Sequence, residues 1–73
     1  MTDFTIKHFI MKFFRDRPNQ VFHTSTVNEW VTTQYKKVHG KPPIGVSTDV
    51  NQLYHDGQLI HVGHGLYKYN PAR

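Results

Sequence analysis

Two β-rich runs, residues 58–62 and 66–69, are joined by the tripeptide Gly63-His64-Gly65. Glycines on both sides of one residue supply the positive φ angles that a tight hairpin needs. This spacing predicts an antiparallel hairpin near the end of the chain. A third β-like run, Val21-Phe22-His23, is too short to stand alone, so we expect it to pair with a strand elsewhere.

Apolar residues recur at helical spacing in three other segments. The first is residues 3–16, with Thr2 as the expected N-cap, Asp3 in the first turn and Pro18 just beyond the end. Its apolar stripe consists of Ile6, Phe9, Ile10, Phe13 and Phe14. The pattern predicts an amphipathic helix with one buried face.

The second predicted helix spans residues 26–39. Thr26-x-x-Glu29 is a capping-box pattern at its start, and Gly40 suits the left-handed position after its end. The face expected to be buried holds Val27, Trp30, Val31 and Val38, with Tyr35 at its border.

The third predicted helix spans residues 48–56, with Ser47 as the expected N-cap, Asp49 in the first turn and Gly57 at the end. Its buried stripe is predicted to be Val46, Val50, Leu53 and Tyr54. The opposite side presents a row of uncharged or weakly basic polar residues: Thr48, Asn51, Gln52 and His55. Such a row is unusual, because exposed helix faces more often carry lysine and glutamate.

With 73 residues, the chain has room for one domain and no deep pocket or cofactor lobe. It contains no cysteine, so neither a disulfide framework nor a thiolate zinc site supports it. Stability must come from packing, and six aromatic residues are expected in the core: Phe9, Phe13, Phe14, Phe22, Trp30 and Tyr54. We expect a domain over residues 1–73 with its core in 3–69, and residues 70–73 as a tail or the start of a linker.

The net charge is +4, and the excess of cations lies in the second half. Up to Tyr35 there are four basic and three acidic residues, whereas the remainder has five basic and two acidic ones. A concentrated positive field favours a polyanionic partner. A solvated basic face that keeps the protein soluble explains the same charge equally well.

Enzymatic and membrane functions find little support in the sequence. No metal-protease helix, nucleotide-binding loop or carboxylate pair is present, and helix capping explains Ser25 and Ser47. His61 and His64 lack a carboxylate or thiol that would complete a metal site, so we expect no metal and no cofactor. The chain has no signal-peptide pattern and no apolar stretch of membrane-spanning length, which predicts an intracellular protein, cytoplasmic or associated with the nucleoid.

The predicted order is helix, strand, helix, helix, strand, strand, which is an α+β fold. The segment VSTDVNQLYHDGQLIHVGHGLYKY combines a helix ending in Asp-Gly, a Gln-Leu-Ile strand, a Gly-x-Gly tip and an aromatic return strand. In this order and this segment the chain resembles the winged helix-turn-helix family of DNA-binding domains, over about residues 3–69. The resemblance implies a three-helix core, a small antiparallel sheet and one wing.

The resemblance also implies which residues contact DNA. The helix before the hairpin, residues 47–56, would be the recognition helix in the major groove, with Thr48, Asn51, Gln52 and His55 as base-contact candidates. Asn and Gln can pair with adenine through two hydrogen bonds, which is consistent with this assignment. The phosphate-contact candidates are Lys36, Lys37, His39, Lys41, Ser47 and Lys68, with His64 at the wing tip. The connection 40–46 is longer than a simple helix-turn-helix turn, and Pro42-Pro43 should stiffen it.

The sequence therefore predicts a non-catalytic module that binds double-stranded DNA. It fits either a small regulator of transcription, acting as a homodimer, or the targeting domain of a longer protein such as a nuclease or restriction enzyme. The alternative is a winged-helix module for protein–protein interaction, in which the outward polar row has no role in binding.

Overall fold

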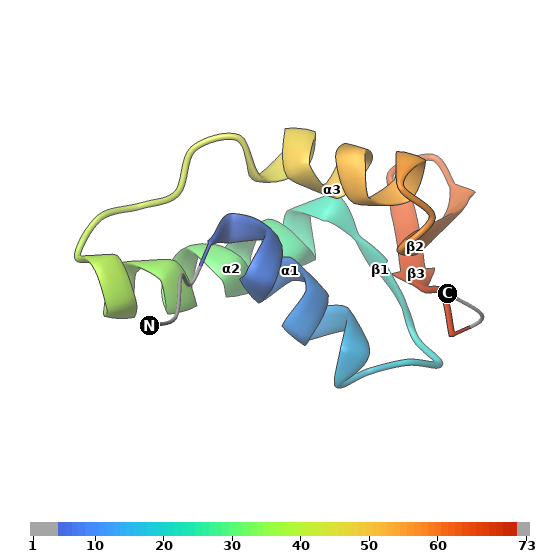
Figure 1. Cartoon of the computed structure of the whole chain (residues 1–73), viewed down its shortest axis with the longest axis horizontal. Helices are drawn as coiled ribbons and strands as arrows, with labels where there is room; N and C mark the ends of the chain where they lie inside the picture. Colours follow the sequence, from blue (N-terminus) through green and yellow to red (C-terminus); the bar gives the residue numbers. More distant parts are fainter. Residues whose placement is uncertain (1–4, 72–73) are drawn as a thin grey trace.

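Three helices and three strands make up the computed structural model, which describes residues 5–71 (Figure 1). In chain order they are α1 (Ile6–Arg15), β1 (Val21–His23), α2 (Thr24–His39), α3 (Val46–His55), β2 (Leu59–Gly63) and β3 (Leu66–Tyr69). The predicted α-β-α-α-β-β order of an α+β fold is confirmed. Figure 1 shows α1 lying across α2, α3 alongside them, and the sheet at one end of the helices.

The strands form one antiparallel sheet in the order β1-β3-β2, so β1 pairs with the return strand of the predicted hairpin. Tyr67 on the central strand is paired with Phe22 on one side and His61 on the other. Lys68 is paired with Val21 and Ile60. Because successive side chains point to opposite faces, these two rows lie on opposite sides of the sheet.

The hairpin turn uses its two glycines differently from the prediction. Of the two, only Gly65 has a positive φ, +70°. Gly63 is instead the last residue of β2, where the pairing register shifts between His61 and Gly63. A β-bulge of this kind changes the strand direction locally, so one left-handed residue is enough to close the turn.

The core is apolar and joins all three helices to the sheet. Its buried residues are Phe9, Ile10, Phe13, Phe14, Val27, Val31, Val46, Val50, Leu53, Leu59 and Tyr67. Phe22 and Trp30 are half-buried and pack against this cluster, with ring centroids 4.6 and 5.4 Å from that of Phe13. The predicted buried stripe of α1 is confirmed, with Ile6 only partly covered.

Two predicted core residues are exposed instead. Val38 is 50% exposed because α2, at 16 residues, is longer than the 10-residue helices α1 and α3 beside it. Its last turn therefore extends beyond the partners that would cover it (Figure 1). Tyr54 is 36% exposed and lies at the edge of the α3 stripe rather than within it.

The predicted helix starts were wrong, because other residues cap the helices. α1 begins at Ile6, and the hydroxyl of Thr5 accepts a hydrogen bond from the His8 amide at 3.1 Å. The expected start at residue 3 is therefore incorrect; Thr2 and Asp3 themselves lie outside the described residues. α3 begins at Val46 after Gly45, which has φ +82° and no side chain to cap with, so Ser47 lies in the first turn and is not the N-cap.

α2 begins two residues earlier than its capping-box pattern predicted. Its N-cap is His23, the last residue of β1, whose ring Nδ1 accepts a hydrogen bond from the Ser25 amide at 3.1 Å. Thr26 and Glu29 consequently lie inside the helix and do not form a capping box. Gly40 does occupy the predicted left-handed position at the other end, with φ +75°.

Candidate nucleic-acid interface

One side of α3 is a continuous row of exposed polar side chains, as the sequence predicted. Thr48, Asn51, Gln52 and His55 are all exposed and fall at helical spacing on a single face. The opposite face is held in the core by Val46, Val50 and Leu53. Figure 1 shows no other element of the described chain lying over the outer side of α3.

The hydrogen-bonding groups of this row are not used within the fold. Across residues 5–71, no described side-chain hydrogen bond involves Thr48, Asn51 or Gln52. Their amide and hydroxyl groups present both donors and acceptors to the outside. Amide side chains such as those of Asn51 and Gln52 can each form two hydrogen bonds with one planar partner, adenine among them.

A cluster of aromatic rings joins the end of α3 to the β2–β3 hairpin. The ring of Tyr54 lies 5.0 Å from that of His55 on its own helix and 5.3 Å from that of His61 on β2, measured between centroids. His61 in turn stacks on Tyr67 with centroids 4.9 Å apart and an interplanar angle of 24°. This cluster was not predicted, because the strand register that brings His61 opposite Tyr67 is not visible in a helix pattern. The cluster sets the position of the hairpin relative to the polar row.

The basic candidates gather beyond the other end of α3. Lys36, Lys37 and His39 lie in the exposed last turn of α2, and Lys41 follows in the exposed connection that leads to α3. The sequence predicted this cluster, and the structure brings all four to one end of the molecule, away from the sheet (Figure 1). Ser47, in the first turn of α3, is exposed where this connection ends. Backbone N–H groups in a first turn have no partner within the helix.

The two candidates on the hairpin differ in where they lie. His64 is exposed in the turn, between Gly63 and Gly65. Lys68 is half-buried on the sheet face opposite Tyr67, and therefore opposite the ring cluster that contacts α3. The structure thus places Lys68 apart from the polar row.

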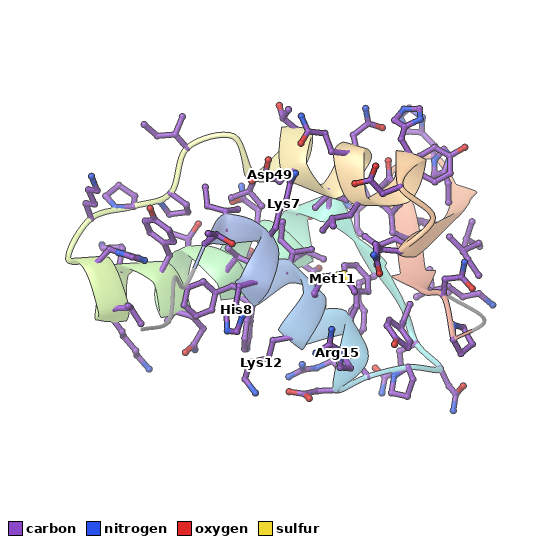
Figure 2. All side chains as sticks on the ribbon, viewed as in Figure 1. Lys7, His8, Met11, Lys12, Arg15 and Asp49 are labelled. Carbon is purple, nitrogen blue, oxygen red and sulfur yellow. The ribbon has the colours of Figure 1, made fainter. Side chains whose placement is uncertain are left out.

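The outer side of α1 carries cations that do not belong to this surface. A hollow of about 410 Å³ is lined there by Lys7, His8, Met11, Lys12, Arg15 and Asp16, all from one helix and its C-cap. Figure 2 shows Lys12 and Arg15 on the side of the molecule away from α3, whereas Lys7 lies on the side nearest Asp49. Lys12 is partly neutralised by Asp16, with an Nζ–Oδ2 distance of 3.4 Å.

Within residues 5–71, no group of three or more His, Cys, Asp or Glu residues is placed to hold a metal ion. No helix in the same part of the chain is long and apolar enough to cross a membrane. The chain matches no family model, no curated protein and no solved structure.

Proposed function

We propose that this protein is a non-catalytic, winged-helix module that binds double-stranded DNA, with α3 in the major groove. The observation that carries the proposal is the exposed row Thr48, Asn51, Gln52 and His55. None of the described side-chain hydrogen bonds uses these exposed side chains, so their donors and acceptors are available to a ligand. Base edges supply partners of matching chemistry.

The size of the molecule supports this arrangement. The Cα positions extend over 32 × 26 × 19 Å. One turn of B-form DNA is about 34 Å long, so a body of this length can contact phosphates on both sides of one major groove. The basic cluster, Lys36, Lys37, His39 and Lys41, would contact phosphates near one end of α3, and the hairpin with His64 would do so near the other. These contacts position the domain, and the α3 row reads sequence.

A role in protein–protein interaction is the competing function, and it draws on a different surface. Val21 and Val62 on the sheet strands are 44% and 49% exposed. Exposed apolar residues on a sheet can bind another protein, but these two valines include none of the α3 row. The two functions therefore predict different sensitive residues.

A gel-shift and fluorescence-anisotropy series over a range of salt concentrations tests the DNA proposal. The double variant Lys36→Ala/Lys37→Ala should weaken binding to all sequences alike and reduce the slope of log affinity against log salt by about two units. Lys12→Ala/Arg15→Ala is the matched control, because it removes the same charge from the side away from α3. It should change binding much less.

The reading role of α3 is tested with Asn51→Ala/Gln52→Ala, which should mainly erase the preference among sequences, at about 1–3 kcal/mol for each lost pair of base hydrogen bonds. Asn19→Ala/Gln20→Ala removes the same two side-chain types from an exposed turn near the start of β1, on the side of the molecule opposite α3 (Figure 1). If both amide pairs behave alike, and Lys36→Ala/Lys37→Ala weakens binding no more than Lys12→Ala/Arg15→Ala, the proposal is wrong.

A further inference from the structure

The segment from Lys36 to Gly45, which we call the basic loop segment, mixes exposed apolar side chains with cations. Ile44 is 89% exposed and Val38 is 50% exposed. The three lysines of the segment are also exposed, and the segment contains no acidic residue. An aliphatic side chain left in water among cations loses the stabilisation that burial provides, about 25 cal/mol per Å² of apolar surface.

The segment is anchored at both ends. At its start, the ring of His39 lies 4.2 Å from that of Tyr35, which packs on Phe9 with centroids 6.2 Å apart. At its end, Val46 is buried in the core directly after Gly45. Pro42-Pro43 restricts the backbone between these anchors. These two anchors and the two prolines limit the positions that Ile44 can take.

The surroundings of Ile44 indicate what kind of partner covers it. Figure 1 shows the connection from α2 to α3 arching away from the helices and meeting the start of α3, whose outer side is uncovered. A partner there must accept an aliphatic side chain while neutralising several cations. Stacked base pairs between two phosphate backbones have both properties, whereas a protein surface would need an apolar patch within a ring of carboxylates.

We infer that Ile44 acts as an apolar wedge that enters the minor groove flanking the major groove occupied by α3. This inference rests on the DNA-binding function proposed above. The lysines of the basic loop segment contact the phosphates on either side of the wedge. Ile44 partly unstacks a base step and kinks the duplex, as aliphatic side chains do in minor-groove binders. Flexible pyrimidine–purine steps should be favoured at this position because they kink most easily.

The wedge is tested with a duplex of about 25 base pairs that contains a central TA step. It carries donor and acceptor dyes at its ends for energy transfer and 2-aminopurine beside the step. Binding of the unaltered protein at low salt should bring the ends closer and raise the 2-aminopurine fluorescence. Ile44→Ser should bind about three- to tenfold more weakly and, at saturation, lose both signals. Ile44→Phe should retain them.

Val21→Ser is the matched control, because Val21 is also an exposed aliphatic residue, 44% exposed, but lies on β1, outside α3, the hairpin and the basic loop segment. It should behave as the unaltered protein. Since Ile44 is 89% exposed, its replacement should leave the melting temperature nearly unchanged, which separates loss of the wedge from loss of the fold.

The outcomes distinguish the wedge from the DNA-binding function itself. Tight binding without a change in either signal, or unchanged signals with Ile44→Ser, would overturn the wedge and leave DNA binding standing. No binding to the duplex at low salt would overturn the proposed function as well. Sedimentation could instead reveal a concentration-dependent dimer that Ile44→Ser abolishes. That result would show that the basic loop segment contacts a second copy of the chain, and it would rule out the wedge.

Discussion

A Cβ atom on Gly65 would lie 2.8 Å from Nε2 of His23. The hairpin turn therefore sits directly on the residue that ends β1 and caps α2. The Thr24 amide donates a hydrogen bond to the Gly65 carbonyl at 3.0 Å, which closes the same contact from the backbone. The turn of the hairpin and the start of α2 thus form one structural unit.

Gly65→Ala should destabilise the protein more than an alanine at another left-handed glycine. The φ of +70° costs about 1–2 kcal/mol for a residue with a Cβ, and the His23 ring must also move. Gly40→Ala is the control, because Gly40 has φ +75° and nothing within 4 Å of its Cβ position. Urea denaturation of the two variants measures the difference. If Gly65→Ala and Gly40→Ala lost the same free energy of unfolding, the His23 ring would have to move away from the new Cβ atom without cost.

The cap on α2 depends on the ring of His23. Its Nδ1 accepts a hydrogen bond from the Ser25 amide at 3.1 Å. His23→Ala removes this acceptor and should lower the free energy of unfolding by about 1 kcal/mol. Urea denaturation of the variant and the unaltered protein measures the difference.

His23→Asn is the companion variant for that measurement. Asparagine is a good N-cap, so it should restore most of the stability that His23→Ala loses. If His23→Ala and His23→Asn lost the same free energy of unfolding, the proposed hydrogen-bond role would be contradicted.

Two valines of α2 that the sequence placed on one apolar face should respond very differently to serine. Val31 is fully buried, whereas Val38 is 50% exposed. Val31→Ser removes buried apolar surface and buries a hydroxyl, which should cost about 2–4 kcal/mol of unfolding free energy. Val38→Ser should stay within about 0.5 kcal/mol of the unaltered protein. Chemical denaturation of both variants provides the measurement, and similar losses would mean that the end of α2 is covered in solution.

These valines show where sequence reasoning succeeds and where it fails. Local signals were sufficient for the hairpin at Gly63–Gly65 and for the apolar stripe of α1, because both depend on residues close together in the chain. Val38 is exposed because α2 extends beyond the ends of α1 and α3. The spacing of apolar residues within α2 does not reveal the lengths of the helices that pack against it. The His23 cap was missed because histidine is not among the residues that usually cap helices, and its role requires β1 to run straight into α2.

In the candidate site too, some residues were placed correctly from local spacing and others were not. The exposed row on α3 follows from helical spacing and was predicted correctly. The position of Lys68 on the far sheet face and the stacking of His61 on Tyr67 follow from strand register. Register is set by pairing between distant segments, and a one-residue shift moves every side chain to the other face.

Tyr54 should be required for holding the hairpin against α3. Its ring contacts His61 and Tyr67, with centroids 5.3 and 6.1 Å away. Each aromatic pair contributes about 0.5–1.5 kcal/mol beyond the burial of its surface, so Tyr54→Ala should lower the free energy of unfolding by about 1–3 kcal/mol. Tyr54→Phe retains the ring and should be close to neutral. Chemical-shift changes in residues 59–69 that appear with alanine and not with phenylalanine would verify the contact.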